Sequence, residues 1–239
     1  MPKVYYIGDS TVQTNVHLKF PQTGIGQVLP IFLKPEYQVI NLAKNGRSTK
    51  SFIDESRFKP VQAGIGKGDF LFIQFGHNDE KKEDSLRYTD PQTSFRDNLK
   101  FFTDTARAVS AYPVIMTPIE RRLFDDTGKL KPSAHTPYVE AELDFGGKEN
   151  VPVIDLCKKS RDLLTRLGDD ESKALYMNFR EGLYLTHPEG KADNTHLRYY
   201  GAFTYAGMIA EGLKELGKPY EDMILTEIPE DDVFAKNGY

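Results

Sequence analysis

The hydrophobic positions of this 239-residue chain gather into short runs that are separated by longer segments of mixed polarity. The runs are rich in β-branched and aromatic residues and occupy residues 4–7, 38–42, 70–75, 113–117 and 152–156. Several of them lack the alternation of polar and apolar positions that marks a half-exposed strand. A continuous apolar run is typical of a strand buried on both faces of a parallel sheet. The pattern therefore predicts five buried, parallel strands.

Helical periodicity occupies the segments between these runs. In the segment 93–110, apolar residues recur at steps of three and four, at Phe95, Leu99, Phe102, Ala106 and Val109. The segment 199–216 shows a second helical pattern, and Gly217 and Pro219 supply its stop signal. Strands that alternate with helices predict the α/β class with a doubly wound parallel sheet.

The chain shows no internal repeat and no low-complexity linker, so we expect a single domain over residues 1–239. From about residue 220 we expect an acidic C-terminal extension, because residues 227–232 are mostly acidic. The stretch 118–150 is long for a simple connection after the fourth strand. Long loops at the carboxyl ends of parallel strands commonly build binding sites.

Charge and composition narrow the class of protein. The net charge of −4 and the pI of about 5.8 argue against a general nucleic-acid binder. No apolar run approaches the length of a membrane span, and no signal-peptide pattern precedes the first strand. The single cysteine, Cys157, excludes an intramolecular disulfide. We therefore expect a cytoplasmic protein more than a secreted one, without a membrane partner, while the oligomeric state is left open.

Candidate chemistry lies where the predicted strands end. The polar blocks at these points are GDS at residues 8–10, AKNGRS at 43–48 and GHND at 76–79, and DNTH at 193–196 precedes the last helix. The carboxyl ends of parallel strands meet at one edge of a sheet, so the first three blocks share that edge. Ser10 by itself is typical of a helix N-cap. The combination with the other blocks favours a nucleophile instead.

Serine hydrolysis of an ester needs a hydroxyl, a base, a carboxylate that orients the base, and donors for the oxyanion, but no metal or cofactor. Asp193 lies three residues before His196, a spacing that places both side chains on one face of a turn or first helical turn. Asp9 is a poor orienter, since adjacent residues leaving a strand point to opposite sides. The Ser10 and Gly46 amides and the Asn78 side chain are the candidate oxyanion donors.

These four blocks closely resemble the signature of the SGNH or GDSL-like hydrolase family, in which Ser, Gly, Asn and His occur in four successive blocks. The resemblance implies a three-layer α/β/α, flavodoxin-like fold with a five-stranded parallel sheet. It also implies that Ser10 is the nucleophile, His196 the base and Asp193 its partner. The amides of Ser10, Gly46 and Asn78 would then form the oxyanion hole.

A narrower resemblance rests on IGDSTV, FGHND, RRLFDDTGKL and DNTHLRYYGA, which look like the rhamnogalacturonan acetylesterase branch of carbohydrate esterases. The branch implies removal of O-acetyl groups from pectic rhamnogalacturonan or its oligosaccharides through an acetyl-enzyme. Arginine binds carboxylates bidentately, so basic residues are candidates for contact with a uronate. The candidate substrate contacts are His77, Arg121, Arg122 and His135.

Several other functions stay open. The same serine chemistry also suits a lipase, a thioesterase or a xylan-type acetylesterase, and the same fold suits a non-catalytic sugar-binding module. Asp193, His196 and the GHND block also supply ligand types for a metallophosphoesterase, but no second His-rich cluster completes a dinuclear site. The GIGKG sequence at 64–68 precedes a strand, which is the wrong context for a phosphate loop.

Overall fold

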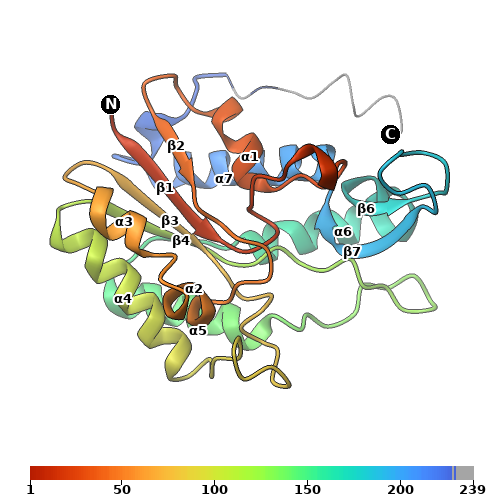
Figure 1. Ribbon diagram of the computed structural model, residues 1–239, viewed down its shortest axis with the longest axis horizontal. Helices are drawn as coiled ribbons and strands as arrows, with labels where there is room; N and C mark the ends of the chain where they lie inside the picture. The colour runs from red at the N-terminus through yellow and green to blue at the C-terminus, as the bar shows by residue number, and fades with distance from the viewer. Residues whose placement is uncertain (228, 230–239) are drawn as a thin grey trace.

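A five-stranded parallel sheet forms the centre of the molecule in the computed structural model, which describes residues 1–227 and residue 229 (Figure 1). The strand order is β2-β1-β3-β4-β5, and every neighbouring pair is parallel. The strands are β1 (Lys3–Gly8), β2 (Gln38–Asn41), β3 (Phe70–Gln74), β4 (Tyr112–Met116) and β5 (Val153–Ile154). This order is the flavodoxin-like one, so the predicted fold class is confirmed.

Helices cover both faces of the sheet because successive strand residues are buried on opposite sides. In β1, Val4 and Tyr6 belong to one core, whereas Tyr5 and Ile7 belong to the other. The first core packs against α1 (Ile25–Val28), α6 (Leu156–Ser172) and α7 (Tyr199–Glu215). The second core packs against α2 (Thr49–Asp54), α3 (Lys59–Gly64), α4 (Ser94–Ala108) and α5 (Thr136–Glu149). The three layers are visible in Figure 1.

A small antiparallel hairpin lies beyond the parallel sheet, and the hydrophobic pattern did not predict it (Figure 1). It consists of β6 (Tyr176–Phe179) and β7 (Lys191–Leu197). Most residues of β7 are polar and only partly buried, so its sequence shows no apolar run. Short 3₁₀ turns complete the described elements, at His17–Lys19, Leu29–Phe32, Lys173–Leu175 and Glu221–Met223.

Two expected segments differ from the structure. The stretch 118–150 is a loop only in its first half, since α5 begins at Thr136 with a proline in its first turn. A buried glutamate, Glu142, interrupts the apolar face of α5 and hides its periodicity in the sequence. The last strand is shorter than predicted because the Asp155 side chain accepts a hydrogen bond from the Lys158 amide and caps α6.

Residues 220–225, the first part of the C-terminal extension expected from about residue 220, lie against the domain. Tyr220, Met223 and Ile224 are buried, and Ile224 forms a β-bridge with Leu33. These apolar side chains hold residues 220–225 against the domain. Most of the acidic run 227–232 lies outside the described residues.

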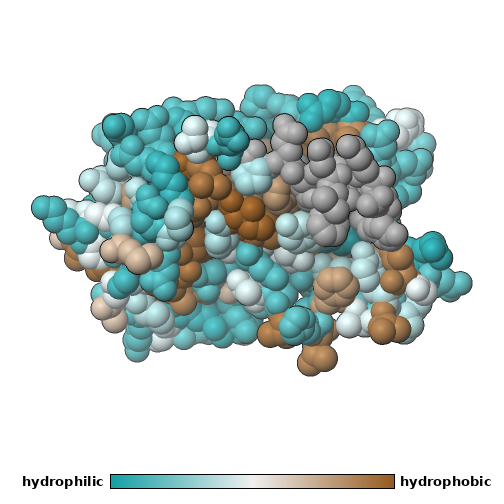
Figure 2. Space-filling view, turned by 90° about the horizontal axis from the view of Figure 1, so that it is seen from above, coloured by the Kyte–Doolittle hydropathy of each residue, from teal (hydrophilic) through white to brown (hydrophobic). Residues whose placement is uncertain are grey.

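The surface seen in Figure 2 is largely hydrophilic, with a strip of apolar side chains across it. None of the helices in the described part of the chain is long and apolar enough to cross a membrane.

Gly8 ends β1 at a point where the backbone of β3 and a side chain of the following turn approach closely. A Cβ at this position would lie 2.7 Å from the Gln74 carbonyl oxygen and 2.9 Å from Val12 Cγ2. Real Cβ atoms do not tolerate such separations, so Gly8→Ala must displace either the strand or the turn that carries residue 10. We expect a loss of about 1–3 kcal/mol in the free energy of unfolding, from denaturant titration.

The matched control for this variant is Gly147→Ala in α5, where an added Cβ meets nothing within 4 Å. That change should stabilise the protein by up to about 1 kcal/mol, since alanine is the better helix former. Equal stabilities for the two variants would contradict the close approach at Gly8.

Candidate active site

Ser10 lies in a tight turn directly after β1. The Asp9 carboxylate accepts hydrogen bonds from the backbone N–H and the hydroxyl of Thr11, both at 2.9 Å. The Asp9 carbonyl accepts from the amides of Val12 and Gln13. Burial raises the pKa of Asp9, and its carboxylate is hydrogen-bonded to Thr11. Asp9 therefore shapes the turn that presents Ser10, as the alternation of side chains at a strand end suggested.

His196 connects Ser10 to Asp193. Its Nε2 lies 3.0 Å from Ser10 Oγ, and its Nδ1 lies 2.8 Å from Asp193 Oδ2. A carboxylate only accepts, so Nδ1 carries the proton and Nε2 is left to accept from the serine hydroxyl. The structure thus brings together the three residues predicted as nucleophile, base and orienting carboxylate, in the arrangement of a Ser-His-Asp triad.

A bulge in β7 creates the spacing between Asp193 and His196. The register passes from Asn178 opposite Ala192 to Tyr176 opposite Leu197, so residues 193–196 face only one residue of β6. Within the bulge, Asp193 Oδ1 accepts the backbone N–H groups of Thr195 and His196, at 2.9 and 3.0 Å. The turn that brings the Asp193 and His196 side chains together therefore lies within strand β7 and not in a helical turn.

The ionised form of Asp193 is favoured in the folded protein. Partial burial by itself would raise the pKa of this carboxyl, but the hydrogen bond and charge of His196 and the two backbone N–H groups together hold the pKa below its ordinary value. Asp193 therefore stays charged and stabilises a protonated His196 ring.

Arg122 anchors the bulge from outside. Its backbone N–H donates to the Asn194 carbonyl at 2.9 Å, and its Nη1 donates to Asn194 Oδ1 at 2.8 Å. Its Nη2 donates to the carbonyl and the carboxylate of Asp169. Arg122 is buried, and its Nη1 and Nη2 are bonded within the protein, so these contacts give it a structural role. The substrate contact expected from the sequence stays a prediction.

The Gly46 turn lies beside the Ser10 turn. The Lys44 amide donates to the Gly8 carbonyl at 2.9 Å, and the Asn45 amide donates to Gln13 Oε1 at 2.6 Å. Gly46 has a φ of +77°, and no atom lies within 4 Å of an added Cβ. The left-handed backbone explains glycine at this position, and the open space leaves room for a ligand.

The Asn78 side chain joins this group from the end of β3. Its Nδ2 donates to the Arg47 carbonyl at 3.1 Å, directly after Gly46. A carboxamide nitrogen has two N–H donors, and in the described part of the chain the second one has no acceptor. The Ser10 turn, the Gly46 turn and the Asn78 amide group are therefore cross-linked at the predicted edge of the sheet.

The remaining predicted contact residues form a buried cluster next to Asn78. The rings of His77 and His135 meet edge to face with centroids 4.4 Å apart. Glu80 accepts from His135 Nδ1 at 2.8 Å and pairs with Arg121 Nη2 at 2.7 Å. Burial, followed by the charges of His135 and Arg121, lowers the pKa of His77 well below its usual range. His77 is thus a neutral ring beside the candidate oxyanion donor.

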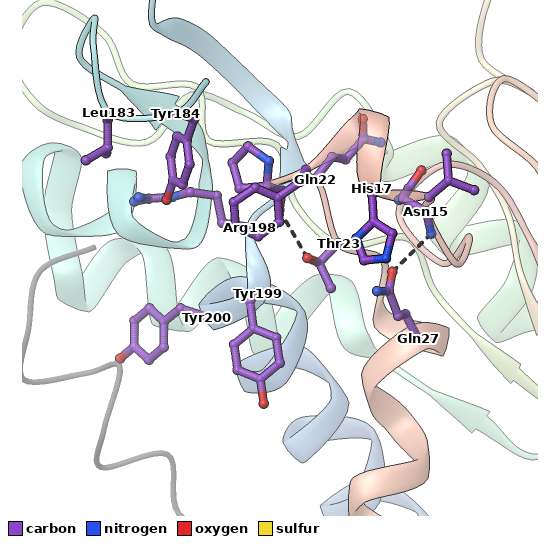
Figure 3. Close-up of a pocket in the computed structure, with 13 residues that line it drawn as sticks. Asn15, His17, Gln22, Thr23, Gln27, Leu183, Tyr184, Arg198, Tyr199 and Tyr200 are labelled. Atoms are coloured by element: carbon purple, nitrogen blue, oxygen red, sulfur yellow. Dashed lines mark hydrogen bonds between the residues drawn. The ribbon is translucent and has the colours of Figure 1, made fainter. Parts of the chain in front are cut away.

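An apolar cavity of about 880 Å³ lies between residues 15–27, residues 183–184 and the start of α7 (Figure 3). It is joined to the triad through the Thr23 amide, which donates to the Leu197 carbonyl at 2.9 Å. Side chains from three segments surround it in Figure 3, among them Asn15, His17, Gln22, Leu183, Tyr184, Arg198, Tyr199 and Tyr200. The one hint of this cavity in the sequence is the pair of tyrosines at the start of the last helix, Tyr199 and Tyr200.

The hydrogen bonds of Ser10, His196 and Asp193 have the geometry of a serine hydrolase whose nucleophile follows the first strand. The chain belongs to the GDSL-like Lipase/Acylhydrolase family, whose model matches residues 6–192. The predicted family resemblance is therefore confirmed, and the protein is a carboxylic ester hydrolase.

Two relatives from Bacillus subtilis resemble most of the chain. The rhamnogalacturonan acetylesterase RhgT is 39% identical over 226 residues, covering 94% of both chains. The probable rhamnogalacturonan acetylesterase YesY is 36% identical over 224 residues, covering 94% of this chain and 98% of that protein. These matches support the narrower resemblance to the rhamnogalacturonan acetylesterase branch.

Solved structures share the fold at lower identity. The Bacillus subtilis protein YxiM superposes with a TM-score of 0.75 at 24% identity, over 91% of this chain and 57% of that one. The acetylxylan esterase Axe2 from Geobacillus stearothermophilus superposes with a TM-score of 0.65 at 17% identity, over 95% and 97% of the two chains.

Sequence reasoning missed Asp79, which holds together the loops around Asn78. Its buried carboxylate accepts from the Thr49 amide at 3.0 Å and from the Thr89 hydroxyl at 2.9 Å. Tyr138 donates to the Asp79 carbonyl at 2.9 Å. The only signal in the sequence was the acidic residue directly after Asn78 in the GHND block.

Burial raises the pKa of Asp79 from 3.8 to about 7, although its hydrogen bonds act in the opposite direction. The folded state therefore binds this proton more tightly than the unfolded state does. The stabilisation is complete below pH about 4 and is lost as the pH rises towards about 7, with a slope on the order of 1 kcal/mol per pH unit. The unfolding free energy of Asp79→Asn should lack this pH-dependent contribution.

Urea titrations of both proteins between pH 4 and pH 8 measure the effect. The unfolding free energy of the wild type should fall relative to that of Asp79→Asn across this window. Parallel curves would show that the pKa of Asp79 is the same in the folded and unfolded states.

Proposed function

We propose that this protein is a serine acetylesterase that removes O-acetyl groups from rhamnogalacturonan or from its oligosaccharides. The observation that carries the proposal is the bridge of His196 between Ser10 Oγ and Asp193 at 3.0 and 2.8 Å. The relatives RhgT and YesY, named as a rhamnogalacturonan acetylesterase and a probable one, support the choice of substrate.

In the first half of the reaction, Ser10 Oγ attacks the acetyl carbonyl carbon while its proton passes to His196 Nε2. The developing oxyanion accepts from the amides of Ser10 and Gly46 and from Asn78 Nδ2. Asp193 holds the imidazolium ring by its Nδ1–H. When the tetrahedral intermediate collapses, His196 delivers the proton to the sugar oxygen, and the free sugar hydroxyl leaves.

In the second half, a water molecule replaces the sugar. His196 takes a proton from this water as it attacks the acetyl carbon of acetyl-Ser10. The same N–H groups donate to the second oxyanion, and its collapse returns the proton to Ser10 Oγ with release of acetate. Each step uses only groups of this chain and water.

The basic cluster beside Asn78 suits an acidic sugar. Arg121 has a side-chain exposure of 24%, and one of its nitrogens, Nη2, pairs with Glu80. Burial, followed by the charges of Arg87 and Arg121, lowers the pKa of the neighbouring Lys81. A uronate carboxylate in the substrate would be a suitable partner for the exposed part of the Arg121 guanidinium.

A second candidate is a hydrolase for longer acyl chains, and the apolar cavity of about 880 Å³ favours it. Two of the side chains that line this cavity, Val16 and Phe20, are exposed apolar residues. Hydrolysis of a metal-activated phosphoester has less support, because in the described part of the chain no three His, Cys, Asp or Glu side chains are grouped to hold a metal ion.

Acetate release from acetylated rhamnogalacturonan tests the proposal directly. We expect release by the wild type that persists in EDTA and a loss in Ser10→Ala on the order of 10⁴-fold or more, because the variant has no nucleophile. Near-normal release by Ser10→Ala would contradict serine catalysis. Release that disappears only in EDTA would favour the metal-dependent alternative.

Chain-length preference separates the two candidate substrate classes. The wild type should hydrolyse 4-nitrophenyl acetate with a kcat/KM at least about tenfold above that for the octanoate, since a sugar esterase needs no long acyl slot. The opposite preference would place the acyl chain in the apolar cavity and contradict the proposal that the enzyme is a carbohydrate acetylesterase.

A further inference from the structure

The orientation of the Asn78 carboxamide is decided by two neighbours. Nδ2 donates to the Arg47 carbonyl at 3.1 Å, and Oδ1 accepts from Arg87 Nη1 at 3.2 Å. A carbonyl can only accept and a guanidinium can only donate. Both contacts therefore require the same orientation of the amide, with its NH₂ group on the side of the Gly46 turn.

We infer that Arg87 is a positioning residue of this active site, which keeps the Asn78 amide turned so that Nδ2 can donate to the oxyanion. Without Arg87, a half-turn about the terminal torsion of Asn78 would place its oxygen near the oxyanion, where it repels instead of stabilising. The terminal amide torsion of asparagine is broad and roughly two-fold, so without Arg87 the Arg47 carbonyl is the one remaining partner that opposes this turn in the described part of the chain.

Arg87 is well placed for this role because its own loop is closed and braced. The Thr89 amide donates to the Asp79 carbonyl at 3.1 Å and closes the loop at its base. Within the loop, Asp84 Oδ2 accepts from Arg87 Nε at 2.6 Å. The Asp84 carbonyl also accepts from the Arg87 backbone amide at 3.0 Å. These bonds fix the position of the Arg87 guanidinium, which donates to Asn78.

A charge effect accompanies the orientation. Arg87 brings a cation against the oxygen end of the Asn78 dipole, which polarises the amide and strengthens its N–H as a donor. Both effects act through Asn78, and no contact between Arg87 and the substrate is required. This inference rests on the proposed function only in assuming that an oxyanion forms next to Asn78.

A double-mutant cycle on 4-nitrophenyl acetate tests the inference. Arg87→Met keeps an unbranched side chain and removes the donor and the charge. We expect it to lower kcat by about tenfold or more, short of the ~10²–10³-fold expected for Asn78→Ala, with little change in KM. In the Asn78→Ala background the same change should have almost no further effect, because its target is absent.

Arg96→Met is the matched control, since Arg96 is also a partly buried arginine paired with an aspartate, Asp144, but lies in α4. It should leave kcat unchanged. A normal kcat in Arg87→Met, or an equal loss with and without Asn78, would overturn the inference, and a thermal melt of each variant identifies unfolding as a cause. Failure of the proposed function is distinguishable, because wild type and Ser10→Ala would then hydrolyse the ester equally.

Discussion

The hydrogen bond between His196 Nε2 and Ser10 Oγ joins residues that are 186 positions apart in the sequence. Different parts of the fold hold its two ends. One end is fixed by the central sheet, because β1 lies between β2 and β3 and ends in the Ser10 turn. The other end is fixed by the bulge of β7, which Arg122 ties to the loop after β4. The catalytic geometry therefore depends on a small hairpin outside the main sheet.

The third element of the site, the loop after β3, is organised by two carboxyl groups that lie away from water, those of Asp79 and Glu80. Asp79 collects donors from Thr49 and Thr89, and Glu80 pairs with Arg121 and His135. Burial of a carboxylate costs free energy unless the group is paired or hydrogen-bonded. The segments that supply these partners are therefore held in place. Asn78 lies directly before them in the chain, and this rigidity positions its amide group without a regular element.

The site is bordered by two different surfaces. On the Asn78 side, buried histidines and basic residues are suited to polar or acidic groups, whereas the cavity at the start of α7 is mostly apolar and aromatic. Aromatic rings offer flat apolar faces, and both acyl chains and sugar rings can pack on such faces.

The hydrophobic pattern predicted the five parallel strands and the polar blocks that meet at the edge of the sheet, and the family resemblance implied the flavodoxin-like order of the strands. Continuous apolar runs identify strands buried on both faces, and the family signature identifies Ser10, Gly46, Asn78 and His196. The way in which His196 reaches Ser10 is visible only in the folded protein, because the β7 bulge has no apolar period. The same holds for Arg122, which braces the bulge, and for Arg87, which donates to the Asn78 amide oxygen. Contacts between distant polar side chains leave no periodic pattern in a sequence, since they depend on where separate loops meet.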